Sequence, residues 1–459
     1  MGLPRPRVPQ RRAAIAASVA VFAAVVVIAL SPLSAAVRPP KLQYQISTLP
    51  NGLRVILSED HSTPIVHISV WYHVGSKNER AGRTGFAHLF EHMMFKGSKN
   101  VEPDSHTSII ASVGGRSNAY TTEDETVYWQ TLPAHYLPLA LWLEADRMAT
   151  LRVDDEAFRR EREVVKEERR MRVENQPYGR LSEIIYDHAF TTHPYKHPTI
   201  GSMADLEAAS ITDVRDFHTA YYVPENATIA VVGDFDSQQA LQMVTQYFAR
   251  VPKATKPVPR DIPKEPAQTK ERRAVVEEAW PLPAVVVAYH VTYDGHPDAY
   301  PLHITAKIMS DGQSARIPLE LMYKKRIALT AFGSGNITEH PNLFYAVAIV
   351  QPGQTPQAAE QALVAEFDKL TKEPVLANEL QRAKNQFARD YIVSRESNED
   401  KARHLAHSAV IHNDIAAADG EFDIFMNVAA SDIQRVARTY FNESNRLVLH
   451  VLPKGAGTR

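Results

Sequence analysis

Two histidines and a glutamate lie close together in the segment TGFAHLFEHMMFKG, which runs from Thr84 to Gly97. His88 and His92 are four residues apart, so on a helix their imidazoles project from one face about one turn apart. Two imidazole nitrogens at that spacing can bind one zinc ion, and Glu91 can reach a metal-bound water without binding the ion itself. The spacing predicts a water-activating zinc site on a helix with Thr84 as its N-cap and Gly97 at its end.

The third protein ligand must come from another part of the chain. A catalytic zinc takes three protein ligands and one water, and a sequence without cysteine leaves only histidine and carboxylate donors. A strongly charged helix predicted over residues 157–173 offers several glutamates. Glu161 and Glu168 are seven residues apart and share a face, whereas Glu167 is rotated by about 100°. Spacing alone leaves all three open as the ligand.

The elements that must position these residues occur twice. Residues 252–272 are rich in proline and lysine and are expected to be a linker. On each side a strand-like run, over residues 65–74 and 284–291, is followed by a helix. Near the end of each half, a helix capped by Thr212 or Ser431 precedes a β-branched strand.

These patterns repeat at nearly constant offsets, 217 from Tyr72 to Tyr289 and 219 from Asp213 to Asp432. We therefore expect an α+β fold of two homologous duplicated domains. Each would hold an antiparallel-rich mixed sheet packed with helices, and the two would face each other across a cleft. The first domain spans residues 39–251 and carries the zinc site, and the second spans residues 273–459.

The motif itself resembles a known family. His88-Leu89-Phe90-Glu91-His92, followed after 75 residues by Glu168, resembles the inverted zinc motif of the pitrilysin/insulinase/mitochondrial processing peptidase family. Residues 161–168 (EREVVKEE) resemble the family's ERxVVxxE helix, and residues 51–55 (NGLRV) also match.

This resemblance implies one Zn²⁺ per chain, with Glu168 as the third ligand and Glu91 as the general base. It makes Glu161 a carboxylate that orients a ligating histidine. It also implies that a strand around Asn118 and Ala119 pairs with an extended peptide substrate.

The second half departs from the pattern. It has no HxxEH motif, and His303 with Lys307 is the nearest equivalent, so we expect no second zinc in this half. In the family the second half usually supplies an arginine and a tyrosine seven residues apart. Alignment places Met322 and Leu329 at those positions, or Tyr323 and Thr330 after a one-residue shift, and the nearby Lys325, Arg326 and Tyr345 stay open as alternatives. We expect a dimer, and hypothesise a heterodimer in which a sister subunit supplies the missing arginine and tyrosine.

The function expected is that of a zinc endopeptidase acting on peptides or small unfolded polypeptides. Two alternatives stay open: a non-catalytic scaffold or assembly subunit on the same fold, and a processing peptidase for one defined target. Scaffold members usually lose part of the zinc motif, whereas His88, Glu91, His92 and Glu168 are all present, which favours a peptidase.

Composition and the N-terminus bear on partners and location. The chain has 459 residues, and its 51 Lys+Arg nearly cancel its 53 Asp+Glu, which argues against nucleic acid as a partner. Residues 1–38 combine a basic start, an apolar run from Ala13 to Leu30 and a small-residue site at Ser34-Ala35-Ala36. They predict a signal peptide or an N-terminal anchor on an exported, periplasmic protein, with membrane contact only if the leader is not cleaved.

Overall fold

Two β-sheets of matching strand order organise the chain. The computed structural model describes residues 38–455, so the leader predicted over residues 1–38 lies outside the described residues apart from its last position. Residues from Leu42 onward form one unit that contains both sheets. Within residues 38–455 no helix combines the length and the apolar character needed to cross a membrane.

The first sheet has the strand order β1-β2-β6-β3-β5-β4. Its strands are β1 (Gln45–Thr48), β2 (Arg54–Glu59), β3 (Ile65–Tyr72), β4 (Arg116–Thr121), β5 (Thr126–Pro133) and β6 (Ala227–Gly233). The second sheet has the order β7-β11-β8-β10-β9. Its strands are β7 (Arg272–Glu278), β8 (Ala284–His290), β9 (Ala328–Gly335), β10 (Leu343–Val350) and β11 (Arg446–Pro453).

The two sheets correspond strand for strand once β1 is set aside. In each sheet the first strand of the half pairs in parallel with its last strand, β2 with β6 and β7 with β11. The other strand pairs are antiparallel. This correspondence confirms the predicted α+β class with a duplicated, antiparallel-rich mixed sheet.

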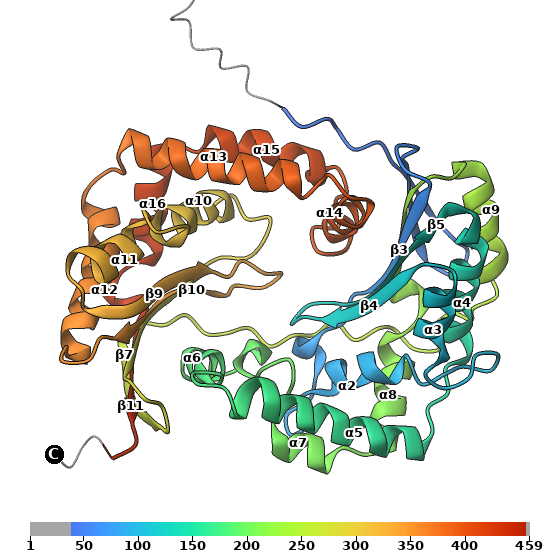
Figure 1. Cartoon of the computed structure of the whole chain (residues 1–459), viewed down its shortest axis with the longest axis horizontal. Coiled ribbons are helices and arrows are strands. Elements are labelled where there is room, and N and C mark those ends of the chain that lie inside the picture. The colour runs from blue at the N-terminus through green and yellow to red at the C-terminus, as the bar shows by residue number, and fades with distance from the viewer. Residues whose placement is uncertain (1–37, 456–459) are drawn as a thin grey trace, which may run out of the picture. The chain divides into compact units, whose positions relative to one another are not determined.

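Helices pack against both sheets (Figure 1). The first half contributes α2 (Phe86–Met93), α3 (Ser105–Ser112), α4 (Leu137–Thr150), α5 (Asp155–Arg169), α6 (Leu181–Ala189), α7 (Met203–Ala208), α8 (Ile211–Tyr221) and α9 (Ser237–Phe248). The second half contributes α10 (Ala299–Ser310), α11 (Arg316–Pro318), α12 (Pro356–Lys372), α13 (Ala377–Val393), α14 (Asn398–Val410), α15 (Ala417–Asn427) and α16 (Ala430–Tyr440). Short 3-10 and π-helical turns join several of them.

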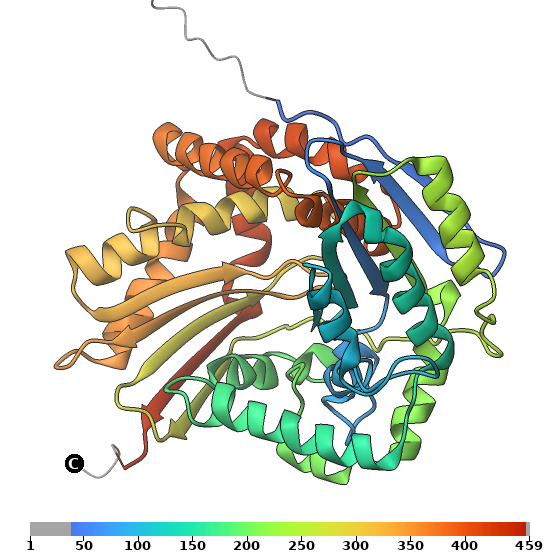
Figure 2. The same ribbon diagram turned by 45° about the vertical axis from the view of Figure 1, so that its right-hand side comes forward.

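Central strands of each sheet are buried on both faces, as their apolar runs ATIAVVG (β6) and AVVVAYH (β8) require. One face of each sheet packs on helices of its own half. The other face is covered by a helix from the opposite half. Leu405 and Ala409 of α14 pack on the first sheet, and Ile184 and Ile185 of α6 pack on the second. Figure 2 shows both helices against these sheets. The halves thus share their apolar cores.

Two details of the prediction need correction. The helix caps are Ser210, whose hydroxyl accepts from the Asp213 amide, and Ala429, whose amide donates to Asp432. Thr212 and Ser431 fall inside the first helical turns instead, because the aspartate three positions after each cap accepts a hydrogen bond from the cap's backbone amide.

Candidate metal centre and active site

Helix α2 carries the histidines and is set in the core by its apolar face. Phe86, Leu89, Phe90 and Met93 are buried in the first hydrophobic core. These positions follow the three- and four-residue spacing of one helix face, so the histidines lie on another face. The helix ends at Met93 rather than at Gly97, since a tight turn with the Phe95 and Lys96 amides bonded to His92 and Met93 follows it.

The N-terminus of α2 is capped by a residue that sequence analysis missed. Glu79 is fully buried, and its carboxylate accepts from the backbone amides of Gly85 (2.8 Å) and Ala87 (2.7 Å). Thr84 is therefore not the N-cap, and its hydroxyl donates to Asp205 at 2.5 Å instead. A carboxylate at this end of a helix also complements the helix dipole. Burial raises the pKa of Glu79 well above its usual value, against the effect of these amides.

Two glycines allow the turn before α2 to touch the loop before α7. Gly85 and Gly201 both have positive φ, +91° and +74°. A Cβ on Gly201 would lie 2.3 Å from the Thr84 carbonyl oxygen, and one on Gly85 would lie 2.7 Å from that of Ile200. Side chains at these positions would push α2 away from its place in the first half.

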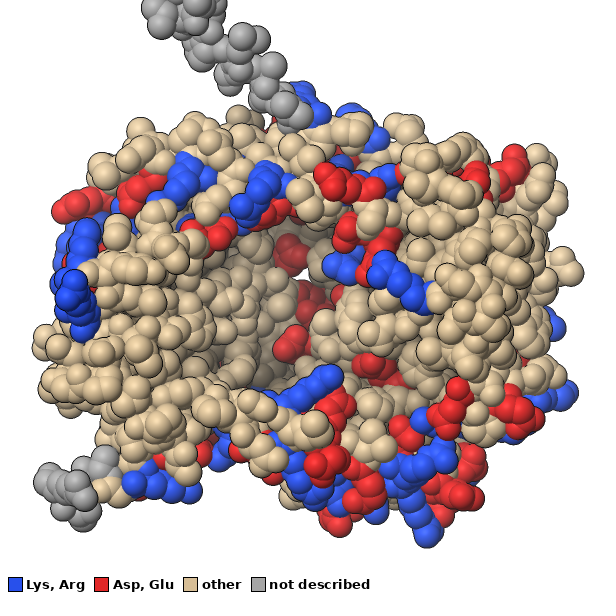
Figure 3. Space-filling model, viewed as in Figure 1, with Lys and Arg blue, Asp and Glu red and all other residues tan. Residues whose placement is uncertain are grey.

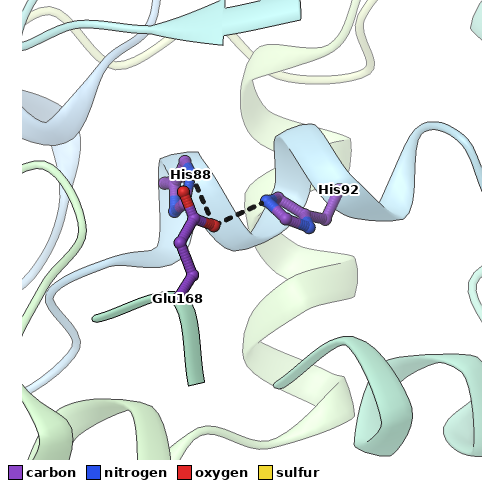
Figure 4. A group of neighbouring side chains, drawn as sticks. All are labelled: His88, His92 and Glu168. Carbon is purple, nitrogen blue, oxygen red and sulfur yellow. Dashed lines mark ion pairs between the residues drawn. The ribbon is translucent and has the colours of Figure 1, made fainter. Parts of the chain in front are cut away.

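Three side chains from α2 and α5 converge on one point (Figure 4). Glu168 Oε2 lies 3.7 Å from His88 Nε2 and 3.4 Å from His92 Nε2. The ligand atoms of His88, His92 and Glu168 all lie within 4.8 Å of one another. Two imidazole nitrogens and one carboxylate oxygen are a donor set that zinc prefers, so these residues fit the ion that the motif predicts.

The structure shows which of the three glutamates on α5 can be the third metal ligand. Glu168 faces the histidines, and its other oxygen lies 2.5 Å from Arg172. Glu161 Oε2 lies 3.5 Å from His92 Nδ1, and its Oε1 lies 2.9 Å from Lys96 Nζ. Glu167 is exposed and pairs with Arg170 at 2.9 Å. Glu161 is therefore placed to orient His92, and Glu167 is not part of the group.

The two histidines differ in their electrostatic surroundings. Burial, reinforced by the neighbouring His92, lowers the pKa of His88 to about 4. Burial opposes protonation of His92 as well, but hydrogen bonds to Glu161 and Glu168 outweigh it and raise the pKa of His92 to about 9. At neutral pH His88 offers a free nitrogen lone pair, whereas His92 must release a proton before it can bind a cation.

Glu91 lies beside this group and is held by β4. Burial raises the pKa of its carboxyl, and the hydroxyl of Thr121 donates to Glu91 Oε2 at 2.6 Å, which partly offsets that effect. Thr121 ends β4, three residues after Asn118. Sequence analysis found no role for Thr121, because the two residues are 30 positions apart and only the fold brings them together.

Strand β4 forms one edge of the first sheet. Asn118 and Ala119 pair with Trp129 and Tyr128 of β5 on one side, and no described strand pairs with β4 on the other. The Asn118 side chain is exposed. The space-filling view shows a hollow in this part of the molecule, with acidic side chains along part of its wall (Figure 3). An edge strand beside α2 can accept an extended chain as a further strand.

Comparison with known proteins agrees with this geometry. Residues 54–203 match the family described as insulinase (peptidase family M16), and residues 208–387 match the peptidase M16 inactive domain. The zinc protease PqqE of Helicobacter pylori is 33% identical over 414 residues, which are 90% of this chain and 93% of that protein. The chain belongs to the insulinase family of peptidases.

Other insulinase-family proteins share the fold or part of the sequence. The crystal structure of a protease from Helicobacter pylori superposes with a TM-score of 0.86 at 32% identity and covers 90% of this chain and 100% of that one. The mitochondrial-processing peptidase subunit beta of Saccharomyces cerevisiae is 26% identical over 275 residues, 59% of this chain and 58% of that protein. Several relatives are named zinc proteases, which supports a peptidase type of function.

The positions compared with the family's arginine and tyrosine lie in the second half. Met322 is half-buried in the π-helical turn Leu319–Lys324, where it packs against the second core. Leu329 is exposed on β9. Neither side chain can donate a hydrogen bond to a substrate.

Proposed function

We propose that this protein is a zinc-dependent endopeptidase that hydrolyses peptides or small unfolded polypeptides. One observation carries the proposal: His88, His92 and Glu168 converge within 4.8 Å, and the buried carboxylate of Glu91 is held beside them by Thr121. The mechanism assigns each of these side chains a separate task.

His88, His92 and Glu168 would hold the zinc ion. When bound, zinc polarises a peptide carbonyl and lowers the pKa of a water to about 7. Glu161 accepts the Nδ1 proton of His92 and is itself held by Lys96, so the ring keeps its Nε2 directed at the site.

Glu91 moves the proton. Its raised pKa makes it a better base than an exposed carboxylate at neutral pH, and the Thr121 hydroxyl fixes which oxygen is free to act. Glu91 takes a proton from the attacking water and delivers it to the leaving amine nitrogen when the peptide bond breaks. The same carboxylate is then ready for another cycle.

Strand β4 would hold the substrate. The free edge at Asn118 and Ala119 supplies main-chain donors and acceptors to an extended peptide, and the exposed Asn118 side chain can bond to the peptide as well. An unfolded chain fits this mode, because its backbone donors and acceptors are not already paired within a sheet.

We propose further that the chain works as a dimer with a sister subunit. Met322 and Leu329 replace the arginine and tyrosine of the family, so a second subunit would supply those donors. Full peptidase activity of the purified chain alone, with no gain when a sister subunit is added, would contradict this part of the proposal.

Hydrolysis of a quenched fluorescent peptide library, with zinc content measured on the same sample, tests the main proposal. We expect turnover that is lost on treatment with 1,10-phenanthroline and restored by added Zn²⁺. A zinc-loaded protein that cleaves nothing, alone or with its sister subunit, would favour the scaffold alternative. Cleavage of a single sequence in the library would favour a processing peptidase.

A further inference from the structure

A second group of ligand-type side chains lies far along the sequence from the HxxEH motif. Asp294 lies in the loop between β8 and α10, His407 lies in the last turn of α14, and His412 follows that helix by two residues. Asp294 Oδ2 lies 3.0 Å from His407 Nε2 and 3.0 Å from His412 Nε2. Their ligand atoms all lie within 4.8 Å of one another.

Both histidines approach the same carboxylate oxygen of Asp294. His407 makes a hydrogen bond to Asp294, but His412 Nε2 has no hydrogen-bond partner although it approaches the same oxygen. The His412 side chain is only 8% exposed, so this nitrogen is also shielded from water. One carboxylate oxygen faces both imidazoles and is hydrogen-bonded to only one of them, and a cation held between the three ligand atoms would engage all three.

The surroundings repeat a feature of the first site. His412 Nδ1 faces Glu421 Oε1 of α15 at 4.0 Å, much as His92 Nδ1 faces Glu161 Oε2 at 3.5 Å. A carboxylate behind a histidine is the usual support of a metal ligand. Asp294 is held as well, because its Oδ1 accepts from the Gly295 amide and its own amide donates to Thr338.

The donor set indicates which cation would bind. Two imidazole nitrogens and one carboxylate oxygen suit zinc, whereas calcium and magnesium prefer oxygen ligands throughout. We propose that Asp294, His407 and His412 form a second zinc site, independent of the site on α2 and α5. The His407 side chain is 41% exposed, so this side of the cluster is open to solvent.

The site has a structural consequence. Helix α14 covers the first sheet through residues such as Leu405 and Ala409, whereas Asp294 extends from a strand of the second sheet. An ion bound by Asp294 and by the end of α14 therefore fastens the helix that covers one sheet to a loop of the other. Zinc binding at this site stabilises the arrangement of the two halves.

Zinc stoichiometry of the full chain tests this proposal. We expect about two zinc ions per chain in the wild type and about one in Asp294→Asn or His407→Gln. The double variant His88→Gln/His92→Gln should bind about one zinc ion per chain. The triple variant that also carries Asp294→Asn should bind none. His135→Gln, which changes a histidine near the start of α4, is the matched control and keeps the wild-type count.

Thermal unfolding separates a lost ligand from a misfolded variant. Added Zn²⁺ should raise the Tm of His88→Gln/His92→Gln, and the rise should disappear when His407→Gln is added, while circular dichroism stays unchanged. Zinc counts that are the same in the wild type, Asp294→Asn and His407→Gln would overturn the proposal. A His88→Gln/His92→Gln variant that binds no zinc would also overturn it, leaving a histidine–aspartate ion pair.

Discussion

Corresponding helix pairs in the two halves are joined in different ways. In the first half α2 and α5 meet through His88, His92 and Glu168. In the second half α10 and α13 occupy the matching place in the chain order, and Lys307 of α10 bonds to Asp390 of α13 at 2.6 Å. Lys307 is 219 residues after His88, the same offset that relates the two halves. A lysine–carboxylate ion pair thus joins α10 to α13, whereas the candidate metal ligands join α2 to α5.

This difference explains how the same fold can form a metal-binding half and a half without that site. A helix pair closed by an ion pair needs no cofactor and cannot activate water. A pair closed by two imidazoles and a carboxylate is complete only with a bound cation. The match of residues 208–387 to a domain described as inactive agrees with this division.

The largest expected effect comes from removing a histidine of the first half. His92→Ala should lose zinc from the first site and bring peptide hydrolysis to background, because two ligands hold zinc far more weakly than three. His303→Gln changes a histidine of α10 in the second half and should keep both zinc and turnover, measured per folded chain. Loss of zinc in His303→Gln would show that α10 takes part in zinc binding and would contradict the difference between the two helix pairs.

Removing the support of a ligand should have a smaller effect. Glu161→Gln should weaken zinc affinity about 10–100-fold, because His92 loses the carboxylate that orients it. Competition with a chelator of known affinity measures the change. Glu167→Gln alters an exposed glutamate of the same helix and should leave the affinity unchanged. Equal effects of the two substitutions would contradict the assignment of Glu161.

The contact between the two halves should depend on pH. Glu339, in the loop between β9 and β10, bonds to His73 at 2.6 Å and to Lys77, while its amide donates to Asp124 in the matching loop of the first half. Burial opposes ionisation, but His73 and Lys77 outweigh it and lower the pKa of Glu339 to about 2. A lowered pKa gives stability that is present above the unfolded value of 4.5 and lost as pH falls toward about 2.

Urea unfolding of Glu339→Gln checks this expectation. The variant should be less stable than the wild type by about 2 kcal/mol at pH 7, and the gap should narrow below about pH 4. Glu373→Gln changes an exposed glutamate and serves as the control. If the wild type and the variant differed in stability by the same amount at pH 7 and below about pH 4, the charge of Glu339 would contribute nothing to the free energy of unfolding.

The smallest effect is expected at the ion pair of the second half. Lys307→Met removes a partly exposed pair with Asp390 and should lower the free energy of unfolding by about 0.5–1 kcal/mol. Zinc content and turnover should not change. A fall in zinc content would show that the pair does more than join α10 to α13.

Much of the first site could be predicted because it is local. Four-residue spacing places His88 and His92 on one helix face whatever the rest of the chain does, and the duplication is visible as a constant offset. Choosing Glu168 over Glu161 and Glu167 needed the family resemblance, because all three glutamates lie within one helix and only the packing of α5 on α2 separates them.

Other features depend on contacts that no local pattern reveals. Glu79 replaces Thr84 as the cap of α2 because burial brings its carboxylate to the helix amides. Asp294 is 113 positions from His407, and their meeting follows from α14 crossing to the other sheet. The packing of α6 on the second sheet could not be predicted for the same reason, since α6 precedes the linker in sequence and the second sheet follows it.

Substitution of Glu91 by glutamine tests whether this carboxylate moves the proton during peptide hydrolysis. Glu91→Gln keeps the size and the Thr121 contact of the side chain but cannot accept a proton. We expect the variant to bind as much zinc as the wild type and to lose about 10²–10⁴-fold in kcat on the quenched peptide library. Equal turnover at equal zinc content would show that another group moves the proton and would contradict the account.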